Sequence, residues 1–164
     1  MNRFIIETKN LDFSFRSGQK ILESLCLQVP AGSIYGFLGP NGAGKTTTLR
    51  IILGLLKNQQ GNVMLFGKNF AGNRLEILRR LGSLIEQPSI YLHLTGRENL
   101  ELFRLNYGCQ KSRIDKVLEI VRLKDAARKK TKAYSLGMKQ RLAIAISLLH
   151  DPEVLILDEP TNGL

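Results

Sequence analysis

Residues 39–47 read GPNGAGKTT, and this stretch constrains the fold more than any other part of the sequence. The pattern G-x-x-x-x-G-K-[ST] is typical of a loop that binds the phosphates of a nucleotide. Its glycines let successive backbone amides turn inward, which a Cβ atom would obstruct. Lys45 supplies a positive charge for the β- and γ-phosphates, and the Thr46 hydroxyl is placed to hold Mg²⁺. The candidate nucleotide-binding residues of the loop are Gly39, Pro40, Asn41, Gly42, Ala43, Gly44, Lys45, Thr46 and Thr47.

The residues on either side of the loop favour a strand before it and a helix after it. Residues 33–38 form a short apolar run that predicts a β-strand, and residues 46–55 predict a helix. A strand, a glycine loop and a helix in this order are the context that a phosphate-binding loop requires. The alternative, a glycine-rich turn without a ligand, is disfavoured by this context.

Two acids follow a second apolar run. Residues 154–159 read VLILDE, and the four apolar residues are typical of a buried parallel strand. An aspartate at the end of such a strand commonly holds the Mg²⁺ of a nucleotide, so Asp158 and Thr46 are the candidate metal-binding residues. Glu159 is the candidate catalytic base that polarises the attacking water. The alternative is that the two acids only open a turn.

The segment between these motifs is predicted to be largely helical. Apolar residues fall at helical spacing from 95 to 132, with a break near Gly108, and a further helix is predicted from about 137 to 149. Ser135 stands at its N-cap position, where a hydroxyl and free amides can meet an anion or can simply cap the helix. The remaining predicted elements are strands at 4–8, 11–15, 21–29, 61–67 and 81–85 and a helical turn at 75–80.

Composition excludes several classes of protein. The chain of 164 residues can bury the core of one domain, and no apolar run reaches the length of a membrane span. The net charge of +10 could indicate a nucleic-acid or membrane surface, but apart from residues 128–132 the basic residues are spread out and not interleaved with aromatic ones. A solvated surface is favoured, and no nucleic-acid partner is expected. Two distant cysteines and the absence of a signal peptide predict a cytosolic protein.

Three motifs in this order, GPNGAGKTT, SLGMKQR and VLILDEP, resemble the ATP-binding subunit of an ABC transporter. The resemblance implies an α/β fold: a P-loop NTPase core of the RecA-like type, an N-terminal antiparallel β subdomain and an inserted α-helical subdomain. It places the β subdomain and P-loop core in residues 1–88 and the helical subdomain in residues 89–136. Residues 137–164 would return to the core and end at the start of the D-loop.

The same resemblance implies roles for further residues. Phe15 matches the aromatic residue that stacks on adenine, although a core strand residue is the alternative. Ser135 and Gly137 match signature positions that contact ATP bound to the partner subunit. The Q-loop residue is Glu86 or Gln87, and the sequence leaves this choice open.

Two departures from the usual signature indicate a subtype. Leu136 replaces the first glycine and Met138 replaces the glutamine, which is similar to exporters of bacitracin, lantibiotics and other drugs. The resemblance therefore implies an ATPase that uses ATP and Mg²⁺ and powers a separate integral membrane permease. The expected partners are that permease, which residues 89–100 would meet, and a second ATP-binding subunit in a head-to-tail dimer. The expected location is the cytoplasmic face of the membrane.

Two other functions compete with this interpretation. A soluble ABC ATPase that acts on ribosomes or DNA would also suit the basic charge, but such proteins usually carry two cassettes or a long coiled coil. A small P-loop kinase is disfavoured because it has no use for the segment 135–141.

The end of the chain carries one further expectation. Residues 160–164 resemble the start of the D-loop, and neither the aspartate expected next nor the later strand with a switch histidine follows. In the RecA-like family that strand lies between the P-loop strand and the Asp158 strand. We therefore expect residues 1–164 to be a fragment that leaves a gap in the central sheet and has little ATPase activity of its own.

Overall fold

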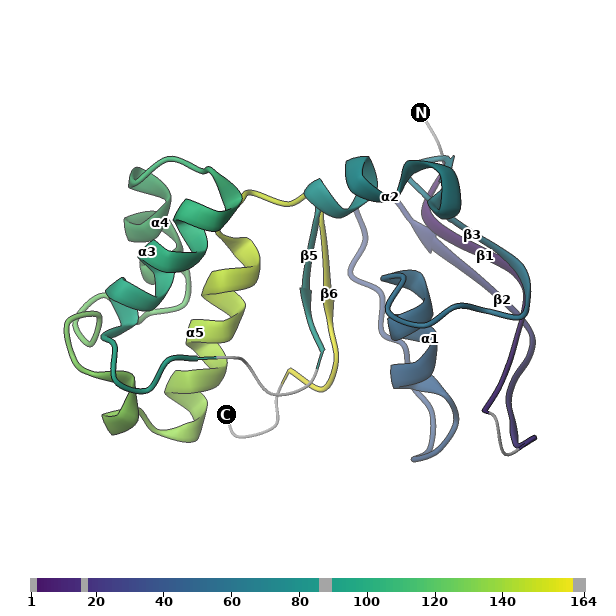
Figure 1. The fold of residues 1–164 in the computed structure, drawn as a ribbon, viewed down its shortest axis with the longest axis horizontal. Coiled ribbons are helices and arrows are strands. Elements are labelled where there is room, and N and C mark those ends of the chain that lie inside the picture. Colours follow the sequence, from purple (N-terminus) through teal and green to yellow (C-terminus); the bar gives the residue numbers. More distant parts are fainter. Residues whose placement is uncertain (1–2, 16–17, 86–89, 161–164) are drawn as a thin grey trace. The chain divides into compact units, whose positions relative to one another are not determined.

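The computed structural model describes residues 3–15, 18–85 and 90–160, which divide into two compact units, residues 1–78 and 79–164 (Figure 1). The first unit contains the glycine loop. The second contains the helical segment and the two acids. None of the described helices is long and apolar enough to cross a membrane.

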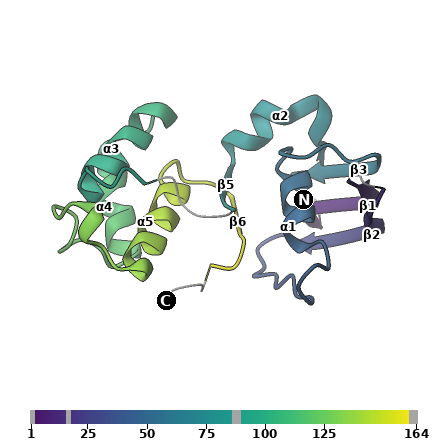
Figure 2. The ribbon, with the colours of Figure 1, turned by 60° about the horizontal axis from the view of Figure 1, so that its bottom comes forward.

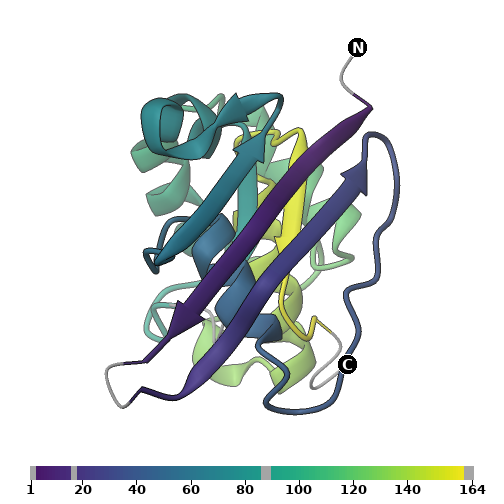
Figure 3. The same ribbon diagram turned by 90° about the vertical axis from the view of Figure 1, so that its right-hand side faces the viewer.

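The first unit is built on an antiparallel sheet with the strand order β2-β1-β3-β4. Its elements are β1 (Phe4–Ser14), β2 (Lys20–Pro30), α1 (Lys45–Ile52), β3 (Gln60–Leu65), β4 (Lys68–Asn69) and α2 (Phe70–Arg79), the last ending at the boundary of the unit. Figure 3 shows the three longer strands side by side, and Figure 2 shows α1 along one face of the sheet. The buried residues of this unit include Ile6, Leu11, Leu27, Ile51, Ile52 and Leu65.

Two strands predicted at 4–8 and 11–15 are a single strand, β1, with an irregularity between them. Asn10 adopts the left-handed region with φ +48°, and its amide donates to the Sγ atom of Cys26 at 3.4 Å. On the neighbouring strand Gly61 lies so close that a Cβ atom there would collide with the Asn10 carbonyl. The Lys-Asn pair therefore bends the strand as a β-bulge does, instead of ending it.

The strand predicted at residues 33–38 is not formed, which corrects the sequence analysis. Among the described residues this segment pairs with no strand, and the side chains of Ile34 and Leu38 are exposed. A strand is stabilised by hydrogen bonds to a neighbour, and none of the described strands pairs with this segment. The apolar run at 33–38 therefore indicated neither a strand nor a buried segment in the described structure.

The second unit joins a two-stranded parallel sheet to a cluster of helices (Figure 1). Its elements are β5 (Leu81–Leu84), α3 (Gly96–Tyr107), α4 (Ser112–Ile120), the short 3-10 helix η1 (Thr131–Ala133), α5 (Leu136–Leu148) and β6 (Val154–Leu157). One buried cluster holds the three α-helices together and includes Leu100, Ile114, Val117, Leu118, Leu142 and Leu149. The predicted helical spacing, the break at Gly108 with φ +67°, and a parallel strand at 154–157 are confirmed. The strand is less buried than predicted, because only Ile156 of its four residues is buried and Leu155 is exposed.

Candidate nucleotide-binding site

The glycine loop has the backbone shape that its sequence predicts. Gly42 and Gly44 both have positive φ angles, +82° and +83°, which only glycine adopts without strain. Gly44 is also the N-cap of α1, and a Cβ atom there would lie 2.7 Å from the Leu22 side chain and 3.2 Å from the Ile21 carbonyl oxygen. The third glycine is therefore required both by its backbone conformation and by its contact with β2.

The loop presents backbone donors at the start of a helix. The amides of Gly42, Gly44 and Lys45 donate to no residue in the described part of the chain. The N-terminus of a helix carries a partial positive charge, and its first amides lack partners within the helix. Residues 39–43 are exposed, so the Gly42 amide is open to an anion from solvent, whereas Gly44 is buried and Lys45 is half-buried. This arrangement suits the oxygens of a phosphate chain.

Lys45 folds back over the loop. Its Nζ atom donates to the carbonyl oxygens of Gly39 at 2.7 Å and Pro40 at 3.0 Å. Both acceptors are neutral, whereas hydrogen bonds between an ammonium and a phosphate are charge-assisted and stronger. A bound phosphate can therefore replace the two carbonyls as the partner of the Lys45 ammonium. The loop backbone does not have to move for this exchange.

A residue that the motif does not include anchors the helix below the loop. Thr48 is fully buried, and both its amide and its Oγ1 atom donate to the carbonyl oxygen of Gly44, at 2.8 and 2.9 Å. This pair of bonds fixes the first turn of α1 relative to the loop. One weak sequence signal pointed to this role: Thr48 is the third consecutive threonine after Lys45.

Phe15 lies near the end of β1 with 45% of its surface exposed. Its ring meets the buried Phe13 ring edge-on, with centroids 5.2 Å apart and an angle of 85° between the planes. Such an edge-to-face pair holds the exposed ring in a defined orientation. The exposure of Phe15 disfavours the alternative of a core strand residue, and its contact with adenine stays a prediction.

Asp158 and Glu159 follow β6 in the second unit. Leu84 of β5 pairs with Leu157, and the Asp158 amide donates to the Leu84 carbonyl at 2.9 Å, which extends the parallel ladder by one residue. The ladder ends there, because Glu159 has φ +44° and is exposed. Both acids thus stand at the carboxyl edge of the sheet, where α/β proteins bind ligands. Glu86 and Gln87, expected after β5, lie outside the described residues.

Ser135 caps α5 as the sequence predicts. Its Oγ atom accepts from the Met138 amide at 3.2 Å, and its backbone is extended. Ser135 is exposed, and Gly137 is half-buried in the first turn. The cap satisfies one amide of the helix terminus and leaves the others available for an anion.

Two buried polar residues, which sequence reasoning missed, hold the loops of the second unit. Asn99 is fully buried, accepts from the Tyr91 amide at 2.9 Å and donates to the carbonyl oxygens of Tyr91 and Thr95 at 3.1 and 2.9 Å. Thr131 is equally buried, and its hydroxyl lies 3.0 and 3.2 Å from the carbonyls of Tyr91 and Leu94. The segment 90–95 is therefore held by buried hydrogen bonds from Asn99 and Thr131. A polar residue on the buried side of a predicted helix was the available signal.

Tyr134, directly before Ser135, is also buried. Its hydroxyl donates to the Ala126 carbonyl at 2.8 Å, and burial raises the pKa of its phenol above the ordinary value. Gly96 packs against it so closely that a Cβ atom there would collide with the Tyr134 hydroxyl. Tyr134 thus ties the start of α3 to the segment that leads into the Ser135 cap.

Comparison with protein families shows which family has this arrangement of motifs. The family of the ABC transporter matches residues 22–162, which contain the loop, the Ser135 cap and both acids. The chain belongs to the ABC transporter family. The predicted resemblance is therefore confirmed, and with it the small P-loop kinase is set aside.

Individual ABC relatives match nearly the whole chain. A bacitracin transport ATP-binding protein of Bacillus licheniformis is 54% identical over 161 residues, which cover 98% of this chain and 52% of that protein. A lantibiotic transport ATP-binding protein of Streptococcus pyogenes is 39% identical over 160 residues, 98% of this chain and 68% of the relative. The chain thus spans about half the length of the bacitracin relatives that it matches.

Solved ABC structures share the fold. An ATP-binding subunit of an ABC transporter matches with a TM-score of 0.83 at 30% identity. The match covers 98% of this chain and 68% of that subunit. A bacterial Atm1-family ABC exporter with ATP bound has a TM-score of 0.86 at 25% identity, over 99% of this chain and 30% of the exporter. The predicted α/β P-loop NTPase fold is confirmed.

Proposed function

We propose that this chain is the ATP-binding and hydrolysing part of a transport subunit that powers a separate membrane permease and exports a drug or antimicrobial peptide. The observation that carries the proposal is the 54% identity to a bacitracin transport ATP-binding protein over 98% of the chain. The loop conformation, the Ser135 cap and the position of Asp158 at the sheet edge support it.

The ligand in this proposal is ATP with Mg²⁺. The amides and the ammonium of the loop at 39–47 would bind the phosphates, and Phe15 offers a free ring face to adenine. Thr46 and Asp158 supply the hydroxyl and carboxylate oxygens that Mg²⁺ prefers. Because Mg²⁺ sites of this kind take only one or two protein ligands, they do not require a cluster of acids. When bound, the ion neutralises charge on the phosphates.

Glu159 is the proposed catalytic base. It is exposed at the end of β6, directly after Asp158, so water can reach its carboxylate. A carboxylate in this role accepts a proton from the water that attacks the γ-phosphate, and Lys45 and the loop amides stabilise the charge that develops. Glu86 or Gln87 would help to orient that water.

The proposed partners are a second ATP-binding subunit and the permease. Ser135 and Gly137, at the exposed start of α5, would meet the ATP held by the loop of the second subunit. The segment 90–95 offers exposed Tyr91 and Leu92 side chains to the permease. The protein would then act at the cytoplasmic face of the membrane without inserting into it.

The direct test is a resistance assay in which the intact protein is expressed together with a candidate membrane permease. Expression of the pair in a bacitracin-sensitive strain should raise the inhibitory concentration of bacitracin. Replacement of Glu159 by Gln should abolish that increase, because removal of a general base typically lowers turnover about 10²- to 10⁴-fold. Glu153→Gln, which removes an exposed acid of the Arg80 ion pair, is the matched control and should retain resistance.

Two other outcomes would contradict parts of the proposal. Full resistance with Glu159→Gln contradicts the role of this residue. Absence of resistance to bacitracin, lantibiotics and other drugs, together with ATP-dependent sedimentation with ribosomes or binding to DNA, would favour the soluble ABC ATPase.

A further inference from the structure

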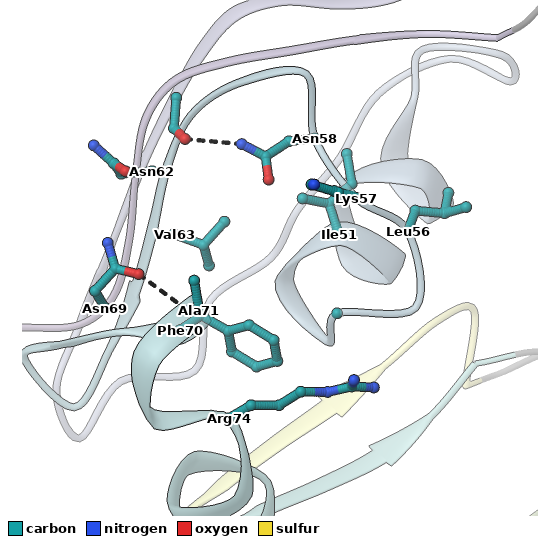
Figure 4. Close-up of a pocket in the computed structure, with 12 residues that line it drawn as sticks. Ile51, Leu56, Lys57, Asn58, Asn62, Val63, Asn69, Phe70, Ala71 and Arg74 are labelled. Atoms are coloured by element: carbon teal, nitrogen blue, oxygen red, sulfur yellow. Dashed lines mark hydrogen bonds between the residues drawn. The ribbon is translucent and has the colours of Figure 1, made fainter.

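A pocket of about 340 Å³ lies at the C-terminal end of α1, the end opposite to the phosphate loop (Figure 4). Its walls come from the end of α1 and the loop after it, from β3 and from the start of α2, all within the first unit. Small-molecule sites have volumes of roughly 300–1,000 Å³, so this pocket could hold a ligand about the size of one substituted ring.

The polar lining of the pocket is cationic and lacks acids. Lys57 and Arg74 line it together with three carboxamides, those of Asn58, Asn62 and Asn69. Neither Lys57 nor Arg74 forms an ion pair or a hydrogen bond with any residue in the described ranges. Some other cations do have an acidic partner, as Lys68 has Glu76 and Arg80 has Glu153. The pocket therefore has positive charge without a counter-ion of its own.

The remaining lining is apolar and tightly fixed. Phe70, Ile51 and Val63 are buried beneath the opening. Gly54, with φ +67°, allows the Phe70 ring to approach so closely that a Cβ atom would collide with it, and that Cβ would lie 3.6 Å from the Nε atom of Arg74. Phe70 and Arg74 thus both reach the end of α1, and the Arg74 side chain runs beside the Phe70 ring in Figure 4.

Two of the carboxamides already form hydrogen bonds within the protein, which limits the groups that they can present to a ligand. Asn58 donates to the carbonyl oxygens of Gln60 and Gly61 at 2.7 and 2.8 Å, and the Oδ1 atom of Asn69 accepts from the Ala71 amide at 3.0 Å. These bonds hold both side chains in place. The Nδ2 group of Asn69 then remains as a donor, which adds to the positive character of the pocket.

We propose that this pocket binds a small organic anion, with a carboxylate facing Arg74 and an apolar body against Phe70, while Lys57 adds positive charge from another side of the pocket. A carboxylate would supply the missing counter-ion and would accept charge-assisted hydrogen bonds. Cations near a helix C-terminus also offset its dipole, but here they make no hydrogen bond to the carbonyls in the described structure. The site is separate from the phosphate loop, since α1 lies between them.

The test compares two probes of nearly equal shape, phenylacetate and neutral 2-phenylacetamide, by ligand-observed NMR. The intact protein is first saturated with Mg-ATP, so that the phosphate loop cannot account for anion binding. Phenylacetate should bind at least about tenfold more tightly than phenylacetamide, because one charge-assisted contact contributes at least that factor. The double variant Lys57→Gln/Arg74→Gln should bind both probes equally weakly, while its ATP affinity stays unchanged.

Arg79→Gln, an exposed change on the same helix outside the pocket, is the matched control and should keep the preference for phenylacetate. Equal affinity of the wild type for the two probes, or no binding of phenylacetate, overturns the proposal without any variant. An unchanged phenylacetate affinity in the folded double variant overturns it as well. If the double variant does not fold, the same comparison applies to Lys57→Gln and Arg74→Gln separately.

Discussion

At the scale of single residues, the phosphate loop combines a fixed backbone with a movable ammonium. The positive φ angles of Gly42 and Gly44 and the buried Thr48 anchor set the backbone before any ligand arrives. Within the described residues, the Lys45 ammonium donates to two neutral carbonyls. Preorganisation of this kind lowers the cost of ordering the site when a ligand binds.

Replacement of Lys45 by Gln should therefore weaken ATP binding without unfolding the protein. Loss of a charge-assisted contact to phosphate costs about 1.5–3 kcal/mol, or roughly 10- to 100-fold in affinity. Equilibrium titration with a fluorescent ATP analogue measures the change, and Lys20→Gln, which removes only an exposed ion pair with Glu23, serves as the control. Equal ATP affinity of Lys45→Gln and wild type would show that the loop is not the phosphate site.

At the scale of elements, close packing of Gly96 and Tyr134 joins α3 to the segment before α5. Gly96→Ala places a methyl group against the Tyr134 hydroxyl, so we expect a loss of about 1–3 kcal/mol in the free energy of unfolding. Tyr134→Phe removes the colliding atom. The double variant should therefore be more stable than the sum of the two single changes predicts, and urea unfolding of all four proteins measures this coupling.

Strict additivity of the two changes would contradict the proposed contact. Gly108→Ala offers a contrast on the same helix. A Cβ atom there meets nothing nearby, so any loss comes from its positive φ alone and should not couple to Tyr134→Phe.

The start of α3 makes stability depend on pH in a predictable direction. Glu98 accepts the Thr95 amide at 2.7 Å, and the Thr95 hydroxyl accepts the Glu98 amide at 3.1 Å, which forms a capping box. The hydrogen bond from the Thr95 amide is the main reason why the pKa of Glu98 lies below its ordinary value. The stabilisation from ionised Glu98 is present above the pKa of an unfolded glutamate and disappears as the pH falls through the lower folded pKa.

Glu98→Gln keeps an acceptor but removes this titration. Wild type should therefore be more stable than Glu98→Gln near neutral pH, and the difference should vanish in acid. Urea unfolding at several pH values gives the difference directly. A difference that is constant down to about pH 3, well below the ordinary glutamate pKa, would show that the charge of Glu98 contributes nothing.

Much of the element order could be predicted, because local signals determine it. The apolar spacing of α3 to α5, the cap at Ser135, the stop at Gly108 and the run before Asp158 all depend on nearby residues. The failures depend on contacts distant in sequence. The run at 33–38 lacks a strand partner in its unit, and β1 continues past Asn10 because Gly61 allows it.

The candidate site divides in the same way. The conformation of the loop followed from its glycines, since a positive φ is a local requirement. The buried Thr131 was missed because its partner Tyr91 lies 40 residues away. Asn99 was missed although its partners Tyr91 and Thr95 are only 8 and 4 residues away. Helical spacing can indicate that a polar residue such as Asn99 faces the core, but it does not identify the groups that the side chain binds.

At the scale of the whole molecule, the proposed chemistry is distributed between two compact units. The loop belongs to residues 1–78, whereas Ser135, Asp158 and Glu159 belong to residues 79–164. In the proposed dimer, Ser135 of one subunit would complete the ATP site on the other subunit. ATP would then be part of the subunit interface. ATP binding would favour the closed dimer over the separated subunits to the extent that ATP binds the closed dimer more tightly.

The central claim is that the loop at 39–47 is one half of an ATP site that a second subunit completes. The most direct test is the mass of the intact Glu159→Gln protein in solution, measured by light scattering with and without Mg-ATP. We predict that the mass doubles when ATP is added and that it stays monomeric when Lys45→Gln is combined with Glu159→Gln. A mass that does not respond to ATP, or that doubles equally in the Lys45→Gln background, would contradict the claim.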